Sequence, residues 1–534
     1  MGDTSGFSRR RLLAGTAAAG GLAVLAPGAA GAHAVGGKGW PSVGSVVIGP
    51  GDPRYADLAR RGVNHRFAAR PEYFQVVGST EQVVRAVGDA VRAGKRITVR
   101  SGGHCQENFV GDPAVDVVLD LGELRAVYYD PSRRAFVIEP GATLQEVYRR
   151  LYFGWDVTLP GGECGTVGAG GHIQGGGYGP MSRMFGSTVD HLYAVEVVVV
   201  GRDGRARAVV ATREPDDPHR DLWWAHTGGG GGNFGVVTKY WMRSPDATGD
   251  DPGGLLPKPP ATLTTGSRTW AWSDLTAASF RRIVRNHGEW HERNSAPDSV
   301  YAGLFSALFL PPKSLGGITV SARVAGGERL LRDYFDALAE GVPAPATPGP
   351  VTTMPWFAAT NQSIQAQVSD DSRYKQKAAY LRRCFTDRQI DAIHHHLTSY
   401  DQNVFGAVEL LSYGGKVNTV APDATALPQR DSILKVLYLG FSTEPAQDPA
   451  AVGWAREIYR SVYAETGGMP VPNQVDDGCY INYPDIDALD PEWNRSGVPW
   501  HTLYYKENYP RLQRVKAAYD PRDVFHHPLS VKRR

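Results

Sequence analysis

The sequence lacks an excess of charge of either sign. Its 534 residues include 57 lysines and arginines against 55 aspartates and glutamates, which gives a net charge of +2. A surface that binds nucleic acid normally shows a basic excess or a basic stripe, and neither is present here. The charge balance therefore excludes nucleic acid as the expected partner and favours a small or neutral molecule.

Cysteine is also scarce, with four residues in the whole chain. This number excludes the disulfide framework that staples small secreted domains, and the spacings lack the paired C-x-x-C pattern of a zinc site. A disulfide that involves Cys164 remains an alternative to a chemical role for this thiol. The run His394–His396 also fails to predict a metal site, because successive helix residues point about 100° apart. No metal is expected.

Long apolar runs are absent except for a weak one near the start. Ser8-Arg9-Arg10-Arg11 precedes an Ala/Gly/Leu segment that ends near Ala26, and small residues follow it. Paired arginines before a mildly apolar segment are typical of a twin-arginine export signal, with cleavage at 30–32 or 32–34. The alternative, a membrane anchor, needs a longer and more apolar segment. Residues 1–34 are thus predicted to be a signal peptide, and the mature protein to be secreted without a membrane anchor, as a monomer or homodimer.

Hydrophobic patterns predict an α+β protein in two main parts. In the first, at 65–245, strands at 73–77 and 96–100 flank a helix that starts at a capping-box pattern. A segment rich in proline, glycine and aspartate at 244–260 marks the boundary. Residues 246–470 alternate helical stretches with strands, which predicts an antiparallel sheet backed by helices. Residues 471–534 have no core of their own and are expected to fold back onto the first part.

Glycine, in contrast, is abundant, and it concentrates in two loops. The strand at 96–100 runs into Ser101-Gly102-Gly103-His104, whose successive backbone N–H groups suit a phosphate. The stretch Gly161–Gly179 contains ten glycines and, among them, Cys164. Glycine leaves the backbone uncovered, so that a ligand can lie directly against it. Two such loops, one with an imidazole and one with a thiol, are a rarer combination than either loop alone.

Three motifs together resemble the berberine-bridge-enzyme-like flavin oxidases of the vanillyl-alcohol-oxidase superfamily, in particular their bacterial members. The motifs are Arg100-Ser-Gly-Gly-His104, Cys164-Gly-Thr-Val-Gly168 with Gly170-Gly171-His172, and Tyr480-Ile-Asn-Tyr-Pro-Asp485. The resemblance extends over residues 49–527. It implies a two-part FAD-binding domain at 65–245, a substrate domain at 246–470, and FAD as the cofactor.

The resemblance also implies how FAD is held. In the family FAD is tethered twice, through a histidine to its 8α-methyl carbon and through a cysteine to ring carbon 6, and His104 and Cys164 occupy these positions. A thiolate is the competent nucleophile, and nearby backbone dipoles are expected to favour it. Val167 matches an oxygen gatekeeper, where a small residue is associated with reoxidation by O₂. The further residues implied to bind FAD are Arg100, Ser101, Gly102, Gly103, Gly165, Thr166, Gly168, Gly171, His172, Gly232, Asn233, Gly235 and Asn482.

Removal of hydride from a carbinol carbon is easier when a positioned base takes the hydroxyl proton. The resemblance implies that Tyr483 is this base. Further active-site tyrosines implied by it are Tyr178, Tyr413 and Tyr480, although each of them alone is compatible with ordinary aromatic packing. Several relatives carry an acidic residue just before the Gly-Gly pair that follows Tyr413. This chain has Leu411 there and Glu409 two residues earlier, so an acidic partner for the tyrosine stays open.

These features predict a secreted oxidase of a small hydroxylated molecule. It would convert a sugar hydroxyl, in an oligosaccharide or on a glycosylated natural product, to a carbonyl or carboxylate while O₂ is reduced to H₂O₂. The alternative is oxidation or oxidative cyclisation of a polyketide or alkaloid by the same flavin. A third hypothesis is a carbohydrate-binding protein without turnover, and the presence of His104, Cys164 and Tyr483 argues against it. The pocket of the second domain decides between the first two.

Overall fold

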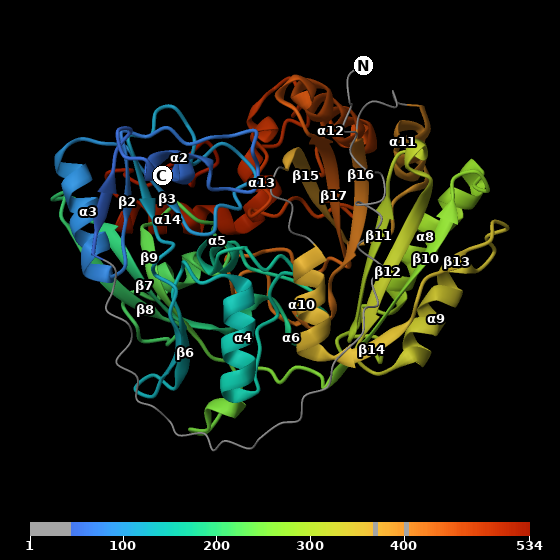
Figure 1. Cartoon of the computed structure of the whole chain (residues 1–534), viewed down its shortest axis with the longest axis horizontal. Coiled ribbons are helices and arrows are strands. Elements are labelled where there is room, and N and C mark those ends of the chain that lie inside the picture. Colours follow the sequence, from blue (N-terminus) through green and yellow to red (C-terminus); the bar gives the residue numbers. More distant parts are fainter. Residues whose placement is uncertain (1–43, 367–371, 400–404) are drawn as a thin grey trace.

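The computed structural model describes residues 44–366, 372–399 and 405–534, which form three sheets and the helices that cover them (Figure 1). The signal peptide predicted at 1–34 lies outside these residues. Within the described ranges, no helix is long and apolar enough to cross a membrane. Two smaller sheets come from the first half of the chain and one large sheet from the second half, which confirms the α+β prediction.

The first sheet has the strand order β1-β2-β4-β3, in which β2 and β3 both run parallel to β4. The helix after β2 begins where the capping pattern predicts, because the Ser79 side chain accepts a hydrogen bond from the Gln82 N–H. Its apolar face, with Val83 and Val87, is fully buried. The elements of this layer are β1 (Val46–Ile48), α2 (Arg54–Arg60), β2 (Tyr73–Val76), α3 (Thr80–Arg92), β3 (Ile97–Arg100) and β4 (Val117–Asp120).

The second sheet is antiparallel, with the order β5-β6-β9-β7-β8. Its consecutive strands form the hairpins β5-β6 and β7-β8. A capping box between Thr143 and Glu146 starts α4, the helix that precedes the second glycine loop. The elements are β5 (Val127–Asp130), β6 (Ala135–Ile138), α4 (Leu144–Trp155), α5 (Ala169–Gln174), α6 (Ser182–Phe185), β7 (Leu192–Val200), β8 (Ala206–Thr212), α7 (Arg220–Ala225) and β9 (Val236–Met242).

The third sheet has eight antiparallel strands in the order β13-β10-β12-β11-β16-β17-β15, with β14 paired to β10. Helix α12 packs on β15 and β17, and α9 packs on β10 and β12. Figure 1 shows these helices at the outer right and top of the molecule. The predicted antiparallel sheet backed by helices is therefore confirmed. Its elements are β10 (Thr262–Ala271), α8 (Ala277–Arg293), β11 (Leu304–Leu310), β12 (Gly317–Val324), α9 (Glu328–Ala339), β13 (Thr347–Pro348), β14 (Thr352–Pro355), α10 (Trp356–Ala366), β15 (Arg373–Leu381), α11 (Asp387–Ser399), β16 (Phe405–Ser412), β17 (Leu434–Ser442) and α12 (Asp448–Val462).

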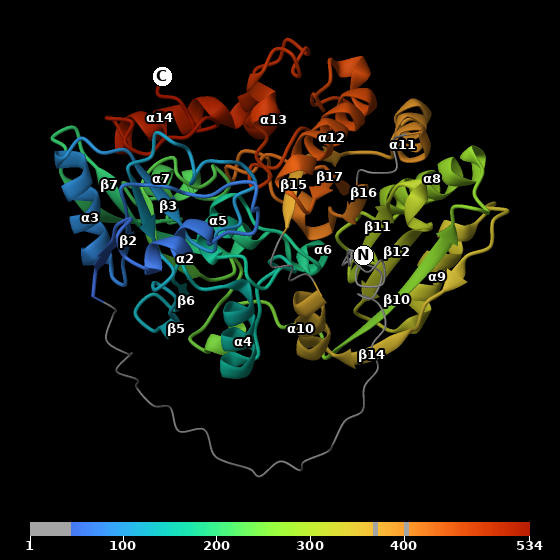
Figure 2. The ribbon, with the colours of Figure 1, turned by 45° about the horizontal axis from the view of Figure 1, so that its top comes forward.

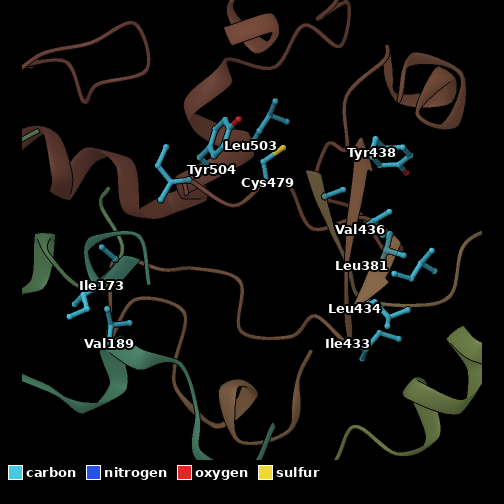
Figure 3. Packing of buried hydrophobic residues seen from close by; sticks show 14 of the residues in the cluster. Ile173, Val189, Leu381, Ile433, Leu434, Val436, Tyr438, Cys479, Leu503 and Tyr504 are labelled. Atoms are coloured by element: carbon cyan, nitrogen blue, oxygen red, sulfur yellow. The ribbon is translucent and has the colours of Figure 1, made fainter. Parts of the chain in front are cut away.

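The C-terminal segment contacts both halves of the molecule. Its helices α13 (Trp500–Tyr505) and α14 (Tyr509–Tyr519) lie across the first half, where the red ribbon runs in Figure 2. Lys516 Nζ donates a hydrogen bond to the Asn233 carbonyl at 2.7 Å. On the other side, the Tyr380 N–H of β15 donates to the Gly478 carbonyl at 2.9 Å. Figure 3 shows Cys479, Leu503 and Tyr504 of this segment in one buried cluster with residues of β15, β17 and the first half.

Candidate active site

A cavity of about 830 Å³ lies where the glycine loops of the first half face the large sheet of the second half. Residues from the end of β3, the 161–179 stretch, the strands β11, β15, β16 and β17, and the Tyr480–Tyr483 loop line it. All three motifs that the sequence analysis singled out therefore meet at one cavity, although they are far apart in the chain.

The two glycine loops touch each other beside this cavity. An ideal Cβ added to Gly102 would lie 2.3 Å from the Gly168 nitrogen, so neither loop has room for a side chain at the contact. Gly103 has a φ of +78°, a conformation that favours glycine. Gly171, in contrast, is exposed, and a Cβ added there would meet nothing within 4 Å. The loops thus pack tightly against each other and leave open space on the cavity side, where a ligand can lie against bare backbone.

His104 and Cys164 both line this open space. His104 Nε2 and Thr166 Oγ1 are 2.9 Å apart, and this hydrogen bond links the two loops. Burial lowers the pKa of His104 to about 4, so the imidazole is neutral at physiological pH. Burial and the Glu163 carboxylate raise the pKa of the Cys164 thiol. The expected stabilisation of the thiolate by backbone dipoles is therefore outweighed by desolvation, and the resting group is the thiol.

Most of the other residues predicted to bind FAD line the same cavity: Arg100, Ser101, Gly102, Gly103, Thr166, Val167, Gly168, Gly171, His172, Gly232, Gly235 and Asn482. Gly165 and Asn233 are buried outside this lining, and their role in binding FAD stays a prediction. The Gly165 carbonyl accepts a hydrogen bond from the Gln145 N–H, and the Asn233 amide donates to the Gly229 carbonyl at 2.9 Å. Both hydrogen bonds hold the shape of their loops.

Three of the four tyrosines meet on the sheet side of the cavity. The hydroxyls of Tyr178 and Tyr483 form a hydrogen bond of 2.9 Å. The Tyr480 hydroxyl accepts hydrogen bonds from the Gly177 N–H at 2.9 Å and from the Asn482 amide at 3.0 Å. Burial raises the pKa of Tyr483 above the ordinary value of a phenol, and the hydrogen bond from Tyr178 opposes this shift. Two phenols in direct contact thus face the cavity that also contains the imidazole and the thiol.

Tyr413 lies outside the lining of the cavity, and its assignment as an active-site tyrosine stays a prediction. It directly follows β16, is 1% exposed and is absent from the lining. Its ring lies behind Tyr178, with 6.0 Å between the ring centroids, and packs against Tyr380 at 5.2 Å. The Arg183 guanidinium donates to its carbonyl at 2.9 Å. Tyr413 therefore supports the tyrosine wall from behind.

The sequence analysis missed Lys435 of β17. Its Nζ lies 3.2 Å from the ring centroid of Tyr178 and 3.6 Å from that of Tyr480. The side chain is buried, and among the described residues its Nζ finds no hydrogen-bond partner. Burial lowers the pKa of Lys435 well below its ordinary value, because the charged form loses its hydration there. The signal in the sequence was a single lysine inside an apolar strand.

The wall that the large sheet contributes is mostly apolar, with Phe305, Leu411, Leu437, Leu439 and Phe441. Gln376 and Glu409 are polar exceptions in this wall. Burial and the nearby Glu163 carboxylate raise the pKa of Glu409 to about 7. Glu163 itself forms an ion pair with Arg323 of β12. The cavity thus has a glycine-rich side in the first half and, in the second half, an apolar side that contains the carboxyl group of Glu409.

Comparison with known proteins agrees with this geometry. The family model described as "FAD binding domain" matches residues 71–209, and the one described as "Berberine and berberine like" matches residues 479–532. The chain is 51% identical to aclacinomycin-N/aclacinomycin-A oxidase of Streptomyces galilaeus, over 98% of each chain. It is 55% identical to a glycopeptide hexose oxidase whose crystal structure contains teicoplanin, with a TM-score of 0.89 over 92% of this chain and 100% of that chain.

A more distant structure shares the fold alone. This is a glucooligosaccharide oxidase of Acremonium strictum, described with a 6-S-cysteinyl, 8α-N1-histidyl FAD. It is 21% identical to this chain, with a TM-score of 0.75 over 91% of this chain and 97% of that chain.

Proposed function

The chain belongs to the berberine-bridge-enzyme-like family and is an FAD-dependent oxidase of CH–OH groups with O₂ as acceptor, and from this premise we propose its substrate class and its FAD linkage. The proposed substrate is a sugar hydroxyl on a glycosylated natural product, which is oxidised to a carbonyl or carboxylate while O₂ becomes H₂O₂. The observation that carries the proposal is the hydrogen-bonded pair of Tyr178 and Tyr483 in the cavity that also contains His104 and Cys164.

The substrate class follows from the sheet side of the cavity. A plain oligosaccharide presents hydroxyls in all directions and needs many polar partners, whereas this wall is mostly aliphatic and aromatic. A sugar attached to an apolar aglycone matches such a wall better, because the aglycone gains free energy from apolar burial. Two relatives named for an aclacinomycin and for a glycopeptide support the same class. The apolar wall also suits the alternative, oxidation of a polyketide or alkaloid without a sugar.

FAD fits the residues present. The open backbone at Gly171, the tight contact of Gly102 with Gly168, and the elongated lining that continues to Gly232 provide space and uncovered N–H groups for a long phosphate-bearing cofactor. When bound, FAD supplies the hydride acceptor. His104 and Cys164 would hold it through two covalent bonds, as described for the glucooligosaccharide oxidase. The neutral imidazole of His104 has the lone pair that such a bond requires.

Tyr483, with its neighbouring tyrosines, would accept the hydroxyl proton of the substrate. In this proposal the Tyr483 phenolate accepts the proton of the substrate hydroxyl as hydride leaves the carbinol carbon. Because burial raises the pKa of Tyr483, the phenolate needs stabilisation from its neighbours. The Tyr178 hydroxyl, at 2.9 Å, can donate to the phenolate oxygen, and the Lys435 amine lies against the Tyr178 ring. Tyr480 is held by a backbone N–H and orients the substrate.

A substrate panel tests the proposal. Glycosylated natural products, their aglycones and oligosaccharides are mixed with the enzyme without oxygen, and bleaching of the flavin absorbance is recorded. We expect glycosylated compounds to bleach the flavin fastest, and H₂O₂ to appear when air is admitted. Fast bleaching by aglycones alone would instead support the polyketide or alkaloid alternative, and fast bleaching by oligosaccharides alone would contradict the proposed class.

We also propose that the enzyme is exported by the twin-arginine route. The arginines Arg9 and Arg10 and the mildly apolar segment after them are the basis for this proposal. Replacement of both arginines by lysine should retain the protein inside the cell, and fractionation of cells and medium measures this. An unchanged amount of enzyme in the medium would contradict it.

Val167 is expected to control access of oxygen to the flavin. Its side chain lines the cavity and packs against the cluster of Leu144 and Tyr148, so an added methylene has to extend into the cavity. Val167→Leu should therefore slow reoxidation by O₂ about tenfold or more, or ~1.4 kcal/mol in barrier, and affect reduction by substrate much less. Stopped-flow absorbance separates the two half-reactions. Equal slowing of both would remove the gatekeeper role.

A further inference from the structure

Glu409 is an acidic side chain in an otherwise apolar part of the cavity wall. It lies in the middle of β16, opposite Phe309 of β11 and Leu437 of β17. Its neighbour on the same face, Leu411, lines the cavity with it. A carboxylate in such surroundings loses hydration, and this loss is tolerated when an opposite charge or hydrogen-bond donors replace the water.

The protein itself does not provide this compensation. The other acidic residue of the lining, Glu163, already has Arg323 as its ion-pair partner. In the described ranges of the chain, no residue forms an ion pair or a hydrogen bond with the Glu409 carboxylate. The Lys435 amine, whose pKa burial lowers, lies against the rings of Tyr178 and Tyr480. Glu409 is therefore a carboxylate that faces the substrate space without a cation.

We infer that Glu409 binds a positively charged amino group of the substrate, so that the enzyme prefers glycosides whose sugar carries an amine. This inference rests on the proposed function and specifies its substrate class. A sugar hydroxyl would supply a hydrogen bond but no charge, whereas an ammonium group supplies up to three N–H donors and neutralises the carboxylate.

The tyrosines give a second reason for a cationic substrate group. Burial raises the pKa values of Tyr178 and Tyr483, and the negative charge of Glu409 adds to this shift, which opposes formation of the phenolate. An ammonium group beside Glu409 would cancel this effect. A substrate that carries an amine would thus not only bind but also make the proposed base easier to ionise.

A matched pair of probes tests the inference on the flavin-containing enzyme. The probes are daunorubicin, an anthracycline glycoside with a primary amine on its sugar, and N-acetyl-daunorubicin, in which that charge is removed. Equilibrium dialysis without oxygen measures affinity and does not require turnover. We expect the enzyme to bind the amine probe about 10- to 100-fold more tightly, which corresponds to a charge-assisted hydrogen bond. Glu409→Gln should abolish this preference and keep the affinity for the acetylated probe.

Gln376→Leu is the matched control, because it removes a polar but uncharged group from the same wall. It should keep the preference for the amine. A pH series on the unmodified enzyme gives an independent test. The preference should increase as the pH rises through about 7, where Glu409 becomes ionised, while the acetylated probe shows no such change. Among the facing groups, Glu163 forms an ion pair with Arg323, burial raises the pKa values of Tyr178, Tyr483 and Cys164, and burial lowers those of Lys435 and His104, the latter to about 4. Because the acetylated probe meets the same groups, it separates their titration from that of Glu409.

Two results would overturn the inference: equal affinity for both probes in the unmodified enzyme at every pH, or an unchanged preference in Glu409→Gln. Failure of the proposed function is distinguishable, since it would appear as absence of H₂O₂ with every glycoside, whichever probe binds more tightly. Formation of H₂O₂ from glycosides together with equal probe affinities would reject only the role of Glu409.

Discussion

After acid precipitation, the yellow colour of the unmodified enzyme is expected to stay entirely with the protein, and the double change His104→Ala with Cys164→Ala is expected to release FAD completely. The two side chains line one cavity from loops that contact each other, so both can bond to a single ring system. Absorbance of the supernatant and the pellet measures the distribution of FAD. Each single variant should retain attached FAD, because one covalent bond is enough to resist acid.

Cys105→Ala provides a matched control for this experiment. Cys105 is the neighbour of His104, lines the same cavity, and has a pKa that burial raises to about 11. The change is combined with His104→Ala, so that attachment depends on a cysteine alone. If the thiol bond came from Cys105, this double variant would release FAD. We expect it to keep FAD fully attached through Cys164. Free FAD from the unmodified protein would reject the double linkage, and release from Cys164→Ala alone would reject the bond to His104.

Elements with a local sequence pattern could be predicted closely. The capping pattern at the start of α3 and the apolar strands at 73–77 and 96–100 are properties of a few adjacent residues, and the structure has a helix and strands there. Strand β15 was not predicted, because its Lys375 and Lys377 interrupt the apolar pattern. Both lysines are nevertheless buried, since carboxylates from remote segments pair with them. These pairs include Lys375 with Glu107 at 2.5 Å and with Asp485 at 2.8 Å, and Lys377 with Asp487 at 2.8 Å.

The candidate site shows the same division between local and remote information. The motif residues His104, Cys164 and Tyr483 could be placed by resemblance, and they line one cavity. The position of Tyr413 outside the lining could not be predicted, because a motif gives a position in the chain, while the side of the wall on which a ring lies depends on the end of β16. Lys435 was missed because a single lysine inside an apolar strand does not show what surrounds its amine. Its surroundings become visible only in the structure, where rings from four different segments lie around it.

Tyr483→Phe is expected to reduce the rate constant of flavin reduction by roughly 10²–10⁴, the usual contribution of a positioned base. This is about 3–5 kcal/mol in barrier, more than a lost surface hydrogen bond would give. Fold, flavin and most of the binding should be retained, since the phenyl ring keeps its contacts with Tyr178 and Tyr480, at centroid distances of 6.3 and 5.1 Å. Anaerobic rapid mixing measures the rate constant, and the flavin spectrum verifies that the cofactor is intact.

The neighbouring tyrosines discriminate a base from a supporting ring. Tyr480→Phe loses an acceptor for the Gly177 N–H and should reduce the rate constant less than Tyr483→Phe does. The reason is that the Tyr480 hydroxyl positions the loop and does not accept the substrate proton. Tyr413→Phe should cost least, since this buried phenol does not line the cavity. If Tyr413→Phe were the severe variant and Tyr483→Phe mild, the base that accepts the hydroxyl proton of the substrate would belong to the second domain.

In the unmodified enzyme the rate constant of flavin reduction should also rise with pH, because burial keeps Tyr483 protonated and the deprotonated form is the one that reacts. A rate that Tyr483→Phe leaves both fast and dependent on pH would assign the base to another group.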